Sequence, residues 1–315
     1  MNEQKLNQSR ERRMKAVFNW IRVLSLVCML GFISCDKSDN VELIAPLYKD
    51  LNLSGGGDLE IPVLADKWHI ESVQYLPSNE TMLDKEGNPL TLEGNGTVEA
   101  ANGWLTLTHT EDNKLIIGLK ENFDTSNERK LAIYINDGNH CDHVSIIQQA
   151  GTEYELVKSK YEEIEAERKI YVSDKGCSHI TLSNNSSEAV WESTGYIFED
   201  VVESSTFESD AYGAFDWMQG KDIKIDMPEL IIDNKEYSTD RYVYKEGLTT
   251  TPYIKNNKIL IKPYSTLHIR GEITYCKRVY NYIFTIRNTK SGTQFDINGV
   301  WTHIKPIVSH TITEQ

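Results

Sequence analysis

The chain has 315 residues, of which 39% are hydrophobic and 25% are charged, and its formal net charge is −14. This length predicts two domains, or three at most. The acidic balance argues against nucleic acid as a partner, because a phosphate backbone binds basic protein surfaces. Ordinary glycine and proline contents exclude collagen-like chains and long disordered tracts. The composition is that of a globular protein and not of a membrane-embedded bundle.

Residues 1–34 are predicted to form a secretory signal peptide. Six lysines and arginines but only two glutamates fall within 1–22, and 23–33 is an apolar run of eleven residues. Such a run is too short for a membrane-spanning helix, which needs about 20 residues. A basic segment followed by a short apolar one is typical of a signal peptide. The true start is either Met1 or Met14, and the sequence leaves both open.

The signal ends in Phe32-Ile-Ser-Cys35, which resembles the bacterial lipobox. The resemblance implies that Cys35 is acylated and becomes the first residue, and two or three acyl chains anchor a protein stably in a membrane. An ordinary signal peptide with a chance cysteine is the alternative. Asp36 and Asp39 resemble the surface-export signal of Bacteroidetes lipoproteins, which implies an outer-membrane protein displayed on the cell surface. An anchor that faces the periplasm is the alternative.

After Cys35, residues 35–49 are predicted to form an acidic, polar tether, and the remaining chain consists of short strands between turns. Apolar residues alternate in several strands, as in Leu115, Ile117 and Leu119, which places them on one face. No sustained helical pattern interrupts this series. We therefore predict an all-β protein with two antiparallel, immunoglobulin-like β-sandwich domains in tandem, divided near residue 152.

The first domain, residues 50–151, shows an ordered set of features that resembles one known family. These features are Gly55-Gly56, Trp68, Trp104-Leu-Thr-Leu107, 129–135 and 144–151. The set resembles the BACON domain, a Bacteroidetes-associated carbohydrate-binding module that is often N-terminal. The resemblance implies an immunoglobulin-like sandwich that binds glycan or mucin, or else a spacer that holds another domain away from the membrane. The segment 77–103 departs from the compact family pattern and is predicted to be an insertion.

The second domain, residues 152–315, resembles no family that we recognise, but it contains a candidate sugar site. Sugar binding needs flat aromatic faces for the ring and polar side chains for the hydroxyls. One short loop supplies both, and its candidate carbohydrate-binding residues are Tyr212, Phe215, Asp216, Trp217 and Gln219. The competing interpretation places Phe215 and Trp217 in the core. The other tryptophans of the two domains are predicted to be core residues: Trp68, Trp104, Trp191 and Trp301.

No catalytic motif stands out, and we expect a protein that is not an enzyme and needs no cofactor. The sequence contains no Gly-x-Ser-x-Gly, His-Glu-x-x-His or phosphate-binding loop. His140, Cys141, Asp142 and His143 are potential metal ligands, but neighbours in an extended chain point apart, whereas a tetrahedral site needs convergent ligands. A polar hairpin turn is the expected structure for this segment, without a metal.

Three cysteines remain in the mature chain: Cys141, Cys177 and Cys276. We expect three free thiols, and a Cys177–Cys276 disulfide is the alternative. The leading functional prediction is a non-catalytic outer-surface lipoprotein for glycan binding or adhesion, with a glycan or mucin as the ligand. Its partners are then outer-membrane lipid through acylated Cys35, a glycan, and other surface proteins. The competing prediction is a structural spacer, or a protein-interaction lipoprotein that binds no sugar.

Overall fold

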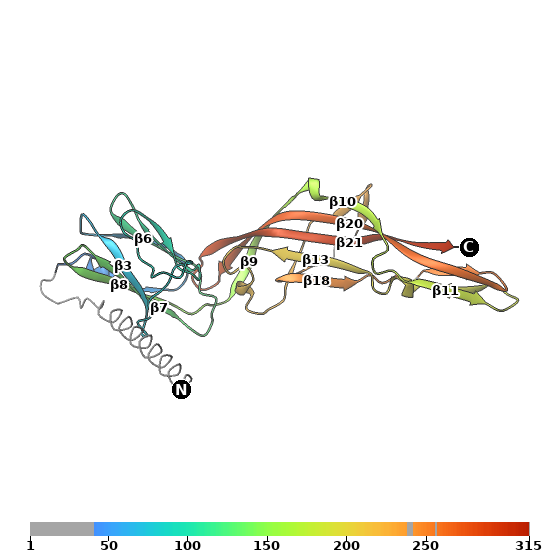
Figure 1. Ribbon diagram of the computed structural model, residues 1–315, viewed down its shortest axis with the longest axis horizontal. Helices are drawn as coiled ribbons and strands as arrows, with labels where there is room; N and C mark the ends of the chain where they lie inside the picture. Colours follow the sequence, from blue (N-terminus) through green and yellow to red (C-terminus); the bar gives the residue numbers. More distant parts are fainter. Residues whose placement is uncertain (1–40, 238–241, 256, 315) are drawn as a thin grey trace, which may run out of the picture.

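The computed structural model describes residues 41–237, 242–255 and 257–314 of the chain. The predicted signal peptide, Cys35 and the two aspartates that follow it lie outside the described residues. The described chain is all-β apart from four 3-10 helices of three or four residues each, which confirms the predicted fold class. The molecule is long and narrow, with the N-terminal domain at one end and the C-terminus at the other (Figure 1). Within this described part, no helix is long and apolar enough to cross a membrane.

The N-terminal domain packs two four-stranded sheets around one core. The first sheet has the order β1 (Asp50–Leu53), β8 (Cys141–Gln148), β7 (Arg129–Asn136) and β3 (His69–Tyr75). The second has the order β2 (Gly57–Pro62), β6 (Lys114–Leu119), β5 (Leu105–His109) and β4 (Gly96–Glu99). Alternate strand residues such as Leu131 and Ile133 point into the core. Met82 and Leu90 reach the same core, so 77–103 is part of the folded domain. Strand β1 pairs with β8 in parallel, so this sheet is not purely antiparallel as predicted.

The predicted tether is wrong over residues 43–49, because this segment is folded into the N-terminal domain. Leu43 and Ile44 are buried in the core, and both of their backbone amides donate to Oδ2 of Asp142, each at 3.1 Å. The ammonium of Lys49 lies 3.0 Å from the same carboxylate. The short helix η1 (Pro46–Tyr48) then leads into β1. Burial of two large aliphatic residues makes this segment the first structural element of the domain.

The second domain is built on a long hairpin of β20 (Ser265–Asn288) and β21 (Gln294–Glu314). Three successive strands line one edge of β20: β9 (Tyr154–Glu163), β10 (Lys169–Ser173) and β11 (His179–Asn184). On the other side β21 pairs with β13 (Val202–Glu208), which pairs with β18 (Gly247–Pro252). Two-stranded sheets are formed by β12 (Val190–Ser193) with β19 (Lys258–Ile261), β14 (Ile223–Ile225) with β17 (Tyr242–Tyr244), and β15 (Leu230–Ile232) with β16 (Lys235–Tyr237).

The long sheet carries two cores on opposite faces. In the half of β20 near the N-terminal domain, even-numbered residues such as Tyr282 and Phe284 are buried, and strands β14 and β17 cover them. In the distal half, odd-numbered residues such as Ile269 and Ile273 are buried instead, under helix η3 (Gly195–Phe198) and β19. Successive strand residues point to opposite faces, so this change of parity moves the covering layer across the sheet. This division into two cores was not predicted from the sequence.

Candidate binding cleft between the two domains

A buried carboxylate joins the two domains. Glu121, which follows β6, is only 6% exposed. Its Oε1 accepts hydrogen bonds from the Gly56 amide at 3.0 Å and the Thr293 hydroxyl at 2.7 Å. Its Oε2 accepts from the Tyr154 hydroxyl at 3.2 Å and the Asn288 amide at 3.1 Å. Gly56 belongs to the N-terminal domain and the other three donors to the second, so one side chain fixes the domains against each other.

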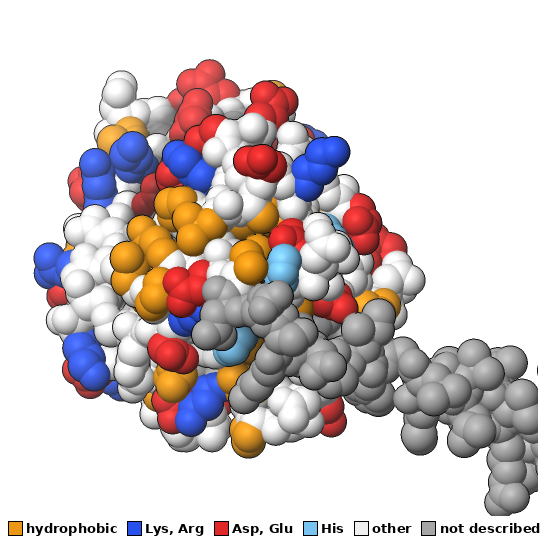
Figure 2. Space-filling view, turned by 90° about the vertical axis from the view of Figure 1, so that its left-hand side faces the viewer, with side chains coloured by type: hydrophobic (Ala, Val, Ile, Leu, Met, Phe, Trp, Pro, Cys, Tyr) orange, Lys and Arg blue, Asp and Glu red, His pale blue; other side chains and the backbone are white. Residues whose placement is uncertain are grey.

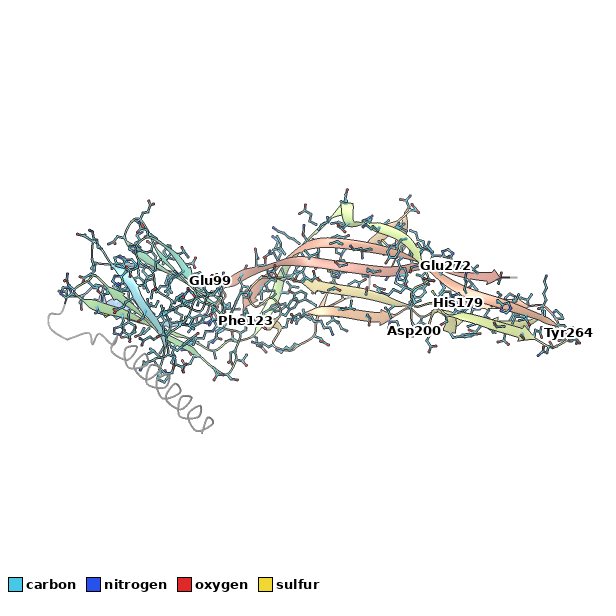
Figure 3. All side chains as sticks on the ribbon, viewed as in Figure 1. Glu99, Phe123, His179, Asp200, Tyr264 and Glu272 are labelled. Carbon is cyan, nitrogen blue, oxygen red and sulfur yellow. The ribbon has the colours of Figure 1, made fainter. Side chains whose placement is uncertain are left out.

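An open cleft of about 500 Å³ lies beside this junction. Loop 122–129 of the N-terminal domain forms one wall, and the loop from Tyr212 to Gly220 in the second domain forms the other. Figure 3 places Phe123 where the two domains meet. The candidate loop therefore lies within the interface between the two domains.

Aromatic rings and one arginine build the N-terminal side of the cleft. Arg129 Nη2 donates to the Tyr212 hydroxyl at 2.7 Å, and the Arg129 guanidinium lies 4.7 Å from the centre of the Trp104 ring. The Tyr212 ring stacks on Phe123 with a centroid separation of 5.9 Å. These contacts cross the interface and hold the Tyr212 ring in a defined orientation.

The close approach of the two loops depends on a glycine. Gly213 has a φ of +69°, and a Cβ at this position would lie 1.8 Å from the Phe123 ring. Any other residue would therefore push the walls of the cleft apart. Gln219 ends the short helix η4 (Asp216–Met218), and its side-chain amide donates to the Thr152 carbonyl at 2.5 Å. The loop is consequently fixed at both of its ends.

Four of the five predicted sugar-binding residues line this cleft: Tyr212, Phe215, Asp216 and Gln219. Phe215 is partly exposed and stacks on Tyr244 at a centroid separation of 5.1 Å. The prediction that Trp217 offers its ring to a sugar is wrong. Trp217 is 2% exposed and belongs to the core of the second domain, because helix η4 turns it inward.

The cleft contains three carboxylates and one guanidinium. Asp124 is held by the side chain of Asn127 and the Ser126 amide, and these hydrogen bonds lower the pKa of its carboxyl group. Glu128 forms an ion pair with Lys130 at 2.9 Å. Asp216 is exposed, and among the described residues its carboxylate has no hydrogen-bond or ion-pair partner. Asp216 is therefore the acceptor best placed to meet a ligand.

The predictions for the remaining tryptophans have two outcomes. Trp68, Trp104 and Trp301 are buried, which confirms their predicted core role. Trp191 was expected in the core but is 62% exposed. It faces Leu260 across a lone two-stranded sheet, and all four residues of β12 are exposed. A strand with no layer packed on it leaves its side chains in solvent on both faces.

The residues of the histidine-rich hairpin diverge. His140 Nδ1 lies 3.1 Å from the Asp137 carboxylate, whereas Asp142 points inward to the backbone of residues 43 and 44. No group of three or more His, Cys, Asp or Glu in the described residues is placed to hold a metal ion. No disulfide joins Cys141, Cys177 and Cys276 to one another, and burial raises the pKa of Cys177 to about 11.

Sequence analysis missed a buried polar network in the second domain. Arg278 and His303 are both fully buried, and Arg278 Nη2 lies 3.1 Å from His303 Nδ1. Burial alone would raise the pKa of Glu203, but hydrogen bonds from His303, Tyr242 and Lys305 outweigh it and lower the pKa to about 2. A charged residue at the inward position of an alternating apolar strand, as Arg278 is, was the available signal. Glu203 also lines a second cavity of about 270 Å³.

No family model matches the chain, and no curated protein matches it. Twelve chains of solved structures do. A protein from Bacteroides thetaiotaomicron, solved by NMR, is 20% identical with a TM-score of 0.26, over 38% of this chain and 100% of that chain. A lamprey immune protein is 10% identical with a TM-score of 0.39, over 87% of this chain and 96% of that chain. Parasporin-2, a Bacillus thuringiensis toxin that recognizes cancer cells, is 11% identical with a TM-score of 0.27, over 60% of this chain and 75% of that chain. These TM-scores are below 0.5, so none supports an assignment of family or function.

Proposed function

We propose that this protein is a non-catalytic surface lipoprotein that binds a glycan in the cleft between its domains. One observation carries the proposal. Tyr212, Phe215, Asp216 and Gln219 were selected from loop composition alone, and they meet loop 122–129 around a single open cleft. A volume of about 500 Å³ lies within the usual range of small-ligand sites.

The chemistry of the walls suits a sugar. The partly exposed rings of Tyr212 and Phe215 offer apolar surface to the C–H groups of a pyranose. The carboxylate of Asp216 accepts hydrogen bonds from hydroxyl groups beside these rings. A specific small-ligand site usually combines aromatic surface with a small number of polar groups.

The charge of the cleft favours a neutral glycan. Asp124, Glu128 and Asp216 outnumber Arg129, and Arg129 already donates to Tyr212 and to the Gln148 side chain. A sialylated or sulfated sugar would therefore meet like charge with no free cation to compensate. The proposed ligand class is an uncharged host or dietary glycan; the resemblance of 50–151 to the BACON family implies a glycan or mucin, and the uncharged class rests on the cleft alone.

The lipid anchor is proposed at Cys35, ahead of the N-terminal domain. Apolar side chains gather on the end face of this domain (Figure 2). The large apolar residues that the domain exposes are Val41, Leu47, Leu64 and Leu83. Exposed apolar surface of this kind suits a domain that rests against a membrane.

A spacer is the second candidate function, because the interdomain joint favours it. Glu121 ties the domains together with four hydrogen bonds, and the molecule is extended along one axis (Figure 1). A stiff rod holds its distal end away from the membrane whether or not the cleft binds sugar.

A glycan array with the chain that begins at Asp36 separates the two candidates. We expect binding to a neutral glycan, and Phe215→Ala and Asp216→Asn should each weaken it at least about tenfold. Trp191→Ala is the matched control, since it removes an exposed ring far from the cleft and should leave affinity unchanged. No bound glycan, or unchanged affinity in both cleft variants, would leave the spacer as the function.

Anchoring is tested in cells. Cys35→Ala should stop the incorporation of labelled palmitate and release the protein from the membrane fraction. External protease should digest the wild-type protein on intact cells. Palmitate in the variant would refute the anchor, and complete protection from protease would refute display on the surface.

A further inference from the structure

Strand β21 has an open edge at the distal end of the molecule. On one side β20 pairs with β21 as far as Glu314, but on the other side β13 pairs with it only from Val300 to Ile304. No strand of the described chain pairs with the outer edge of β21 beyond Ile304, where the Asn257 side-chain amide donates to the Ser309 hydroxyl at 3.3 Å. Figure 1 shows this end of β21 extending past β13 and β18. Unpaired backbone N–H and C=O groups along such an edge are a template for another strand.

The sequence of this edge favours strand pairing. Residues 306–313 read Pro-Ile-Val-Ser-His-Thr-Ile-Thr, with five β-branched residues and no Lys, Arg, Asp or Glu. High β-propensity without charge is the composition that promotes pairing between edges. A register shift near Thr274 and Tyr275, together with Pro306, disturbs only the beginning of the segment.

The other edges of the same sheet are interrupted, charged or closed by proline over part of their length, although β10 and β11 carry no charged residue beyond Lys169. The edge opposite is divided among three strands, and β9 within it carries charges at Glu155, Lys158, Lys160 and Glu162. Strand β18 has six residues and ends in Pro252, which has no N–H to donate. Interruption, charge and proline are the usual means of preventing edge pairing, and β21 lacks all three over 308–313.

We propose that the open edge of β21 pairs with the same edge of a second copy of this chain. Two identical edges pair in antiparallel order around a two-fold axis perpendicular to the sheet, which keeps facing side chains on the same side. Val308, His310 and Ile312 share one face, since they pair with alternate residues of β20. An axis at His310 places Val308 opposite Ile312 of the second copy and Ser309 opposite Thr311.

This register pairs residues of like type better than the two adjacent registers, in which the axis is shifted by one residue. An axis at Ser309 would set Val308 against His310, and an axis at Thr311 would set His310 against Ile312. The axis at His310 instead pairs apolar with apolar and hydroxyl with hydroxyl, and Val308, at 38% exposure, gains the cover that it lacks. A contact of this length buries little area, so the dimer is weak and depends on concentration.

The symmetry places the two N-terminal domains at opposite ends of the dimer, because each lies at the end of its chain remote from the distal half of β21 (Figure 1). If Cys35 carries the anchor, which rests on the proposed function, the dimer bridges two membranes. Adhesion between cells then follows from strand pairing, independently of the glycan cleft.

Sedimentation velocity of the soluble chain from Asp36 tests the dimer without lipid or glycan. All core residues lie at or after Leu43, so this chain carries the complete described fold. The weight-average mass should rise with concentration from that of the monomer toward twice that value. A monomer at every concentration up to the limit of solubility would overturn the proposal.

A pair of charge variants tests the register. Val308→Lys with Ile312→Lys sets like charges opposite each other at two places and should weaken the dimer about tenfold or more. Val308→Lys with Ile312→Glu makes the same positions attract and should restore dimer formation. Equal behaviour of the two variants, with unchanged melting temperatures, would rule out the axis at His310.

A cysteine at the axis gives a second readout. Facing Cα atoms in an antiparallel pair are about 4.5–5.5 Å apart, within the span of a disulfide. His310→Cys should therefore form a covalent dimer under mild oxidation, faster than Thr311→Cys, which faces Ser309 instead. Wild-type protein with its three thiols is the baseline, and equal rates for both variants would contradict the register.

Vesicles of phosphatidylethanolamine and phosphatidylglycerol that carry the lipidated protein test the bridge. They should cluster, and those with the double-lysine variant should not. A dimer in solution without clustering would refute the bridging step. No lipidation at all would refute the anchor and leave the solution result standing.

Discussion

In the N-terminal domain two four-stranded sheets enclose a single core, whereas in the second domain one seven-stranded sheet carries two cores on opposite faces. Both arrangements follow the same alternation of side chains along a strand. The difference lies in where the inward positions fall along β20, which change from odd to even numbers between Tyr275 and Cys276. A single closed core should unfold as one unit, and two separated cores should respond to damage separately.

The largest expected effect comes from the core nearer the N-terminal domain. Trp217→Ala should lower the free energy of unfolding of the second domain by about 3–5 kcal/mol, because Trp217 is 2% exposed. Hydrogen exchange should quicken in β14 and β17 and stay slow in the N-terminal domain. Trp191→Ala, at 62% exposure, is the matched control and should change stability by less than about 0.5 kcal/mol. Equal losses in the two variants would refute the assignment of Trp217 to the core.

A smaller effect is expected from the charged network in that same half. The pKa of Glu203 is lowered to about 2 in the folded protein. A carboxylate whose pKa is lower in the folded than in the unfolded protein stabilises the fold, and this stabilisation is complete at a pH above the unfolded-state pKa. The stabilisation is lost as the pH falls through the folded-state pKa. The gain at neutral pH is about 3 kcal/mol, and it should decline between pH 5 and pH 2.

Urea unfolding across this pH range measures the contribution. Glu203→Gln should be less stable than wild type at pH 7, and the gap between them should narrow toward pH 2. Glu162→Gln, in an exposed position of β9, is the control and should show no such pH dependence. A gap that stays constant with pH would mean that Glu203 contributes packing and not charge.

The smallest of the three effects concerns the joint that couples the two regions. Glu121→Ala removes the acceptor of four donors, of which the Tyr154 hydroxyl keeps another acceptor, the Asn122 carbonyl at 3.1 Å, and should cost about 2 kcal/mol. Calorimetry should then resolve two transitions, because the domains no longer unfold together. Glu128→Ala removes an exposed carboxylate nearby and should leave the thermogram unchanged. A single transition in Glu121→Ala would show that other contacts couple the domains.

Trp217 and Trp191 show the limit of sequence reasoning about the candidate site. Trp191 was expected in the core but is exposed, whereas Trp217, a candidate for the sugar site with the core as the competing interpretation, is buried. The sequence around a ring reports its local conformation but not which layer covers it. Trp191 is exposed because β12 has only β19 as a neighbour, and Trp217 is buried because helix η4 turns it toward Tyr244.

Glu121 is a second residue whose environment could not be predicted from its local sequence. Its four partners are 33 to 172 residues away along the chain, so no local pattern announces that this glutamate is buried. Arg278 differs, because its inward position follows from the alternation of its own strand. The alternation of residues within one strand could therefore be used for prediction, whereas contacts between distant segments could not be predicted from the sequence.

Alternation of apolar residues and turn composition determined by themselves that this protein is all-β, since a period of two is a property of the extended chain. They also determined that one loop combines rings with polar groups, because composition is local. Only the tertiary structure decided that this loop faces the N-terminal domain across a cleft, that residues 43–49 belong to the fold, and that one edge of β21 stays open. Each of these depends on which distant segments supply the buried contacts and hydrogen bonds, and a chain can satisfy its local pattern in many ways before long-range packing selects one.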